Sequence, residues 1–136
     1  PVHRDTLPGG FELLLVHGSA QSADDAVYPS VTDRGLKAKL GGGKPDILVC
    51  GHTHIPFVKR VGGVLVINCG SAGHPVDGDP RPAYALLRIA GTSKPSARIV
   101  RFDYPKDQIL AALGKTSLPK SLSKDYEEGN KKRWMP

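Results

Sequence analysis

The sequence of 136 residues predicts an α/β (α+β) fold from two kinds of pattern. Short, almost wholly apolar runs at residues 11–16 and 47–50 have the length of buried strands, and each stops at a Gly and His pair, as a strand does at the rim of a sheet. Elsewhere apolar residues repeat at i,i+4 ahead of a glycine, which is typical of a helix end. With 39% hydrophobic and 24% charged residues, we expect residues 1–136 to form a single domain.

The remaining elements follow in chain order. Thr32 is expected to cap a helix with Leu36 and Leu40 on one face, and residues 41–43, all glycine, end it. The β-rich runs at 57–61 and 64–67, separated by two glycines, predict a hairpin. Residues 84–89 and 98–102 predict two more strands. The middle of the chain is therefore expected to be a sheet.

Two helices are predicted near the C-terminus. Pro105 suits the first position of a helix that ends at Gly114. A last helix, ending at Gly129, is predicted by residues that fall on one side: Leu118, Leu122 and Tyr126. Residues 130–136 show no periodicity and are expected to be a loose tail.

Cysteine use and hydropathy bear on the compartment. Cys50 and Cys69 are far apart in sequence, and each ends an apolar run, so we expect buried, reduced thiols and a cytoplasmic location. No run approaches the roughly 18 apolar residues of a membrane span, so no membrane association is expected.

The net charge of +6 suits a polyanionic partner, but a solvated C-terminal helix and tail explain most of it. Sparse aromatics argue against a platform on which bases stack.

Three histidines directly follow predicted strands: His17, His52 and His54. Ligands in α/β proteins commonly bind at this rim of the sheet. Neutral imidazoles suit zinc, manganese and iron, so three converging histidines would form a metal site. Taken alone, the His-x-His pair is more typical of exposed loop histidines than of a pair of metal ligands.

The run DILVCGHTHIPFVKRVGGVLVINCGSAGHP at residues 46–75 resembles the calcineurin-like metallophosphoesterase family, whose signature is a buried strand, Gly-His-x-His, a hairpin and Asn-x-Gly-Ser. LLVHGS at 14–19 is similar to the upstream single-histidine motif of that family, and DGDPRPAYALL at 77–87 is similar to its small bacterial branch. The resemblance implies part of a four-layer αββα sandwich, mostly the β-sheet half with two C-terminal helices.

The resemblance also implies a function. His17 and His52 match ligands of the family's second metal ion, and His54 matches a ligand of the first. Two divalent metal ions would be the cofactors, with Mn²⁺ favoured and Fe, Zn, Ni or Co as alternatives. The implied reaction is hydrolysis of a phosphodiester or phosphomonoester, in a phosphate-ester small molecule or a nucleotide, through a dinuclear centre.

The carboxylates of such a centre are missing. The family supplies them from Asp-x-His, Gly-Asp and Gly-Asn-His-Asp motifs in an upstream half, and this sequence contains none of them. The nearest acids are better explained as caps, turn residues or strand-entry residues: Asp24, Asp25, Asp33 and Asp46. No catalytic residue can therefore be assigned, and we expect this chain alone to be inactive.

Three hypotheses follow. In the first, the missing half belongs to the same gene product or to a companion chain. In the second, the chain is a noncatalytic scaffold, as some relatives of this fold are. In the third, the three histidines hold one zinc. Keeping all three histidines argues against the second hypothesis, and the long match to a dinuclear family argues against the third. The first is therefore favoured, and a homo-oligomer is compatible with it.

Other polar residues receive structural interpretations. His3 is expected at the terminal surface, and His74 in an ordinary loop, with a place at the substrate mouth as the alternative. Asn68 is expected to satisfy backbone groups of a loop. A turn is expected to be shaped by local hydrogen bonds of Asp77, Asp79 and Arg81, with a phosphate-binding role of Arg81 as the alternative.

Overall fold

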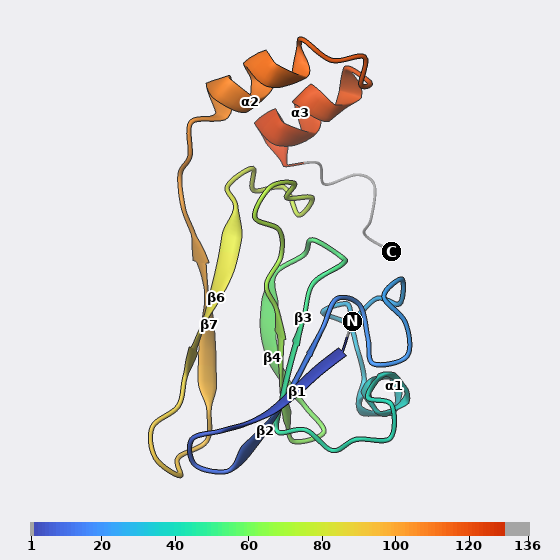
Figure 1. Cartoon of the computed structure of the whole chain (residues 1–136), viewed down its shortest axis with the longest axis vertical. Coiled ribbons are helices and arrows are strands. Elements are labelled where there is room, and N and C mark those ends of the chain that lie inside the picture. Colours follow the sequence, from blue (N-terminus) through green and yellow to red (C-terminus); the bar gives the residue numbers. More distant parts are fainter. Residues whose placement is uncertain (1, 130–136) are drawn as a thin grey trace.

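The computed structural model describes residues 2–129, and its centre is a five-stranded sheet (Figure 1). The strands are β1 (Val2–Leu7), β2 (Phe11–Val16), β3 (Ile47–Cys50), β4 (Phe57–Val61) and β5 (Val64–Asn68), in the spatial order β1-β2-β3-β5-β4. β2, β3 and β5 are parallel, whereas β1 and β4 are antiparallel hairpin partners of β2 and β5. The carboxyl ends of the three parallel strands therefore lie at one edge of the sheet.

The core of the sheet is apolar on both faces. Leu14, Leu48 and Val66 are paired across β2, β3 and β5, and none of them is exposed. This face packs against α1 (Asp33–Lys39), through Leu36 and Leu40. Burial on both faces explains why the parallel strands are continuous apolar runs rather than alternating ones.

The opposite face packs against a second sheet of two antiparallel strands, β6 (Ala83–Arg88) and β7 (Ser96–Arg101). Ile47, Leu65 and Ile67 of the large sheet contact Ala85 and Ala97 of this small one. The outer side of β6 carries Tyr84 and Leu86, which are 44% and 43% exposed. The layers are thus helix, sheet and sheet, and the outer face of the small sheet mixes apolar and basic side chains.

Two helices lie beyond one end of the sheets: α2 (Lys106–Leu113) and α3 (Ser121–Glu128) (Figure 1). α2 buries no residue, and the buried residue of α3 is Asp125. Neither helix is therefore held to the sheets by an apolar stripe of buried side chains. No helix within residues 2–129 is long and apolar enough to cross a membrane.

The predicted elements are confirmed at most positions. β2 and β3 have the predicted bounds, Thr32 caps α1 by accepting from the Gly35 amide, and β4 and β5 form the Gly62–Gly63 hairpin. Gly129 ends α3 in the left-handed conformation, with φ of 61°. The prediction of a loose tail at 130–136 lies outside the described residues.

Three expectations were wrong in detail. β1 was missed because all but one of its residues are exposed, so no buried face leaves a pattern, and Gly9 and Gly10 make its hairpin turn at positive φ. Leu118 precedes α3 rather than lying on it, since the following Pro119 disfavours a helical conformation there. Pro105 caps α2 instead of occupying its first position.

Both thiols are free, with Cys50 buried and Cys69 half-buried. Burial, reinforced by the nearby Cys69, raises the pKa of the Cys50 thiol to about 12, and burial also raises the pKa of Cys69. A thiol reacts as its thiolate. At pH 8 the folded chain is therefore expected to react slowly with a thiol reagent, and two equivalents should react only after denaturation. Rapid reaction of both thiols in the folded chain would contradict this burial.

Candidate metal centre

The predicted ligands lie at the carboxyl edge of the parallel strands. His17 is the residue after β2, and His52 and His54 lie in the loop after β3. The Gly51 amide donates to the His17 carbonyl oxygen at 2.9 Å, which joins the two segments directly. Parallel strands bring residues 35 positions apart together because both strands end at the same edge.

His17 and His52 face each other. Nε2 of His17 lies 3.3 Å from Nδ1 of His52, and the ring centroids are 5.2 Å apart with the planes at 79°. Two nitrogens bound to one tetrahedral ion at about 2.0–2.1 Å would themselves be about 3.3–3.4 Å apart. The spacing suits a shared metal ion as well as it suits a hydrogen bond. The donor set therefore fits a first-row divalent cation.

His54 is placed differently. Its Nδ1 lies 2.7 Å from the backbone carbonyl oxygen of His74, which can only accept, so Nδ1 carries the proton of the neutral ring. Nε2 then keeps its lone pair, as a metal ligand must. No hydrogen bond or ring contact joins His54 to the other two histidines. Within residues 2–129, no three His, Cys, Asp or Glu side chains form a group that could hold a metal.

The loop between β3 and β4 is strained at both of its histidines. His52 and His54 have φ of 61° and 58°, and they are the positive-φ residues other than glycine within the described part of the chain. A bulky residue in this region costs on the order of 1–3 kcal/mol and persists only where its surroundings enforce it. Such residues concentrate at functional sites. Both candidate ligands therefore share a backbone conformation that is uncommon outside glycine.

Asn68 is what holds this loop. Its side chain is fully buried at the end of β5, and Nδ2 donates to the Gly51 carbonyl oxygen at 2.8 Å and to Thr53 Oγ1 at 2.9 Å. Its Oδ1 accepts from the Gly70 amide at 3.0 Å. The expectation that Asn68 satisfies loop groups is confirmed.

Replacing Asn68 by alanine is expected to lower the free energy of unfolding by about 1–3 kcal/mol, because buried acceptors lose their donor. Denaturant unfolding would measure this. Gln21→Ala is the matched control: the Gln21 amide also donates to a backbone carbonyl, that of Ala38, but at an exposed site. Equal stability of the two variants would mean that the Asn68 bonds contribute nothing.

Three of the four acids near the histidines in sequence, Asp25, Asp33 and Asp46, have structural roles, as predicted. Asp25 pairs with Lys39, whose hydrogen bond lowers the pKa of that carboxyl. Asp33 lies in the first turn of α1, and Asp46 accepts from the Glu12 amide at 2.9 Å. The backbone amide of Asp24 donates to Ser22 Oγ at 3.1 Å. None of these bonds involves a histidine.

The other polar residues are placed as follows. His3 is an exposed residue of β1. The Arg81 guanidinium donates two hydrogen bonds to the Asp79 carboxylate, from Nε to Oδ1 at 3.0 Å and from Nη2 to Oδ2 at 2.7 Å. This pairing lowers the pKa of Asp79 to about 2. Arg101 pairs with Asp77. The local, turn-shaping bond is confirmed for Asp79 and Arg81, whose guanidinium is therefore already paired, whereas Asp77 pairs with Arg101, 24 residues away, rather than within the turn.

Comparison with known proteins identifies the class. The profile of the calcineurin-like phosphoesterase superfamily domain matches residues 2–92. The chain is 34% identical over 98 residues to a probable metallophosphoesterase of Methanothermobacter thermautotrophicus, a match that spans 70% of this chain and 49% of the relative. The chain belongs to the calcineurin-like phosphoesterase superfamily, as its motifs predicted.

Solved structures agree on the fold. A metallophosphoesterase of Sphaerobacter thermophilus superposes with a TM-score of 0.73 at 24% identity, over 93% of this chain and 57% of that one. Vps29 of Entamoeba histolytica, solved in complex with Zn²⁺, gives 0.50 at 27% identity, over 75% of this chain and 61% of that one. This chain therefore spans about half the length of the curated relative that it matches.

Proposed function

We propose that this chain supplies the histidine ligands of a metal-dependent phosphoesterase that hydrolyses phosphodiester or phosphomonoester bonds at a dinuclear centre. The observation that carries the proposal is the His17–His52 pair, 3.3 Å apart, at the carboxyl ends of parallel strands in a chain of this superfamily. The positive φ of His52 and His54 supports it, because non-glycine residues in this conformation concentrate at functional sites.

Two divalent ions, when bound, would polarise the phosphate oxygens and activate water. Toward them, His17 and His52 would offer adjacent ring nitrogens, and His54 would offer Nε2 while its Nδ1 is held by the His74 carbonyl. Mn²⁺ is the favoured ion, with Fe, Zn, Ni and Co as alternatives that imidazole also binds. The substrate would be a phosphate-ester small molecule or a nucleotide.

The carboxylates of the centre would come from outside this chain. A pair of dications needs a bridging carboxylate, and no acid among residues 2–129 joins the histidines. A missing half in the same gene product, or a companion chain, would supply it. The exposed apolar side chains Tyr84, Leu86 and Phe102 are compatible with such a partner, and the rings of Tyr84 and Phe102 lie side by side with centroids 5.9 Å apart.

The test is hydrolysis of a diester, bis(p-nitrophenyl) phosphate, and of a monoester, p-nitrophenyl phosphate, in added Mn²⁺, by this chain alone and by any longer product of its gene. Activity in the longer product alone supports the proposal. No activity in either, across all five candidate metals, would overturn it. That second outcome would favour a noncatalytic interaction module, for which the observation in hand is the lack of a complete metal-binding group among the described residues.

A further inference from the structure

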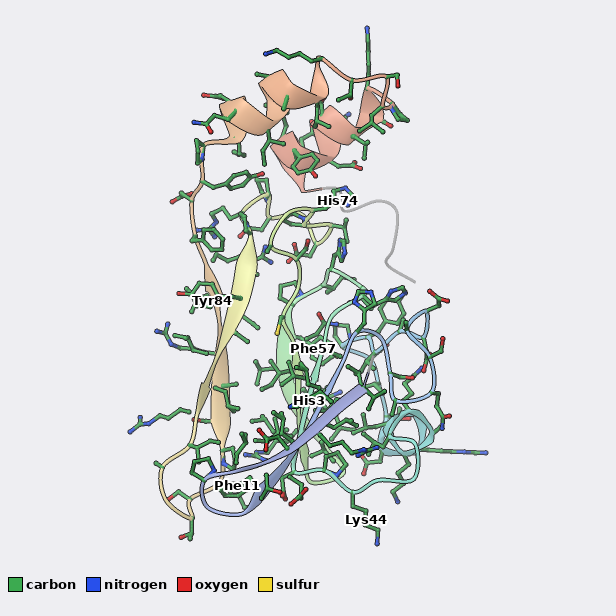
Figure 2. All side chains as sticks on the ribbon, in the orientation of Figure 1. His3, Phe11, Lys44, Phe57, His74 and Tyr84 are labelled. Atoms are coloured by element: carbon green, nitrogen blue, oxygen red, sulfur yellow. The ribbon has the colours of Figure 1, made fainter. Side chains whose placement is uncertain are left out.

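We propose that α3 is an outer support of the candidate metal centre, in which Asp125 and His74 are positioning residues for His54. The inference rests on the proposed function for what the free nitrogen of His54 binds, and on the contacts below for the positioning itself. Figure 2 shows His74 at the end of the strands that faces α3.

The first step joins His54 to His74. The proton on Nδ1 of His54 points at the His74 carbonyl oxygen, 2.7 Å away, and the two rings meet edge to face with centroids 5.7 Å apart. The direction of that carbonyl therefore decides which nitrogen of His54 is protonated. A carbonyl that turned away would release the ring to rotate and to change tautomer.

The second step joins His74 to α3. Nε2 of the His74 ring lies 3.3 Å from Oδ2 of Asp125, and the ring packs on Tyr126 with centroids 5.5 Å apart. On its own loop, the His74 amide donates to Ser71 Oγ at 2.8 Å. His74 is thus fixed on its loop side by Ser71 and on its helix side by α3, and the carbonyl between them is fixed with it.

The third step is the unusual way in which α3 is anchored. Its buried residue is an acid, and the Asp125 side chain is only 9% exposed. Burying a carboxylate is unfavourable unless it is paired, and the His74 ring is one such partner. Gly129, at the C-terminal end of α3, lies against the loop between β5 and β6 that also carries His74. The approach is so close that a Cβ on Gly129 would be 2.6 Å from the Asp79 carbonyl carbon. This contact fixes the position of the end of α3 and, with it, the position of Asp125.

Outer partners of this kind orient a metal-binding histidine and set its tautomer, and their loss typically lowers metal affinity about 10–100-fold. The same size of effect is expected here from Asp125→Ala, with a smaller effect from Asp125→Asn, which keeps an acceptor oxygen. The acid matters through geometry, because it touches His74 rather than any predicted ligand.

The experiment compares wild type, Asp125→Ala, Asp125→Asn and the control Glu127→Ala, which removes an exposed acid from the same helix. The metal-free readout is the tautomer of His54, measured from its ring nitrogen shifts by ¹H–¹⁵N NMR at pH 8. Wild type and Glu127→Ala should show the proton on Nδ1. Asp125→Ala should shift it toward Nε2, and Asp125→Asn should lie between.

Metal affinity is the second readout, measured by Zn²⁺ titration of the longest product of the gene. A His54 tautomer unchanged in Asp125→Ala would overturn the inference whatever the metal result. A tautomer that shifts, in a wild-type protein that binds no Zn²⁺, would support the positioning and overturn the proposed function. The shift together with about 10–100-fold weaker binding supports both.

Discussion

In a complete enzyme, His54→Ala and His52→Ala are each expected to remove a bound metal ion and the phosphoesterase activity that depends on it. Both residues would be direct ligands, so the loss should exceed the about 10–100-fold that follows removal of an outer partner. Metal content and hydrolysis of bis(p-nitrophenyl) phosphate, measured on the same preparation, would show this. Each variant should keep its fold, because both side chains lie at the rim and outside the core.

His3→Ala is the matched control. It also removes an imidazole, but from the exposed edge strand β1, and it should leave both the metal content and the activity unchanged. An unaltered metal content in His52→Ala or in His54→Ala would remove that residue from the ligand set. Loss of metal in His3→Ala as well would mean that the assay reports nonspecific binding by histidines.

Leu14→Ala is expected to lower the free energy of unfolding by about 2–5 kcal/mol, the largest effect predicted on stability. Leu14 is not exposed at all and is paired with Leu48 on the next strand, in the face of the sheet that α1 covers. Its truncation leaves a cavity that the strands on either side cannot close. Denaturant unfolding followed by circular dichroism would measure the change.

The neighbouring residue on the same strand is the control for this effect. Leu15 points the other way and is 43% exposed, so Leu15→Ala should change the stability by under about 1 kcal/mol. If Leu14→Ala unfolded at the same denaturant concentration as wild type, β2 would not be the buried strand described here. A large loss in Leu15→Ala would mean that a partner surface covers this side in solution.

Most of the fold could be predicted because buried segments have a recognisable pattern of apolar residues. β3 is covered on both faces and β2 on the face of Leu14 and Val16, and their apolar runs predicted their bounds directly. β1 has no such apolar pattern, because it is held by backbone hydrogen bonds to β2 and all but one of its residues are exposed. The division into two sheets also could not be predicted from periodicity, because the Ala85 and Ala97 contacts that join the sheets are long-range packing.

The candidate site was predictable in part. The place of His17 and His52 follows from strands that end in histidine, since parallel strands share an edge. The link from His54 through His74 to Asp125 could not be predicted, because it depends on where α3 lies in space and spans 51 residues between the last two members. The positive φ of His52 and His54 likewise leaves no signal when no glycine marks it.

Metal stoichiometry tests the central claim most directly. Elemental analysis by mass spectrometry would be made on this chain alone and on any longer product of its gene, each purified without chelators. The account predicts two divalent ions per molecule in the longer product, and neither of them held tightly by this chain alone. One tightly held zinc in this chain, with no second ion in the longer product, would contradict the split dinuclear centre and support a mononuclear site.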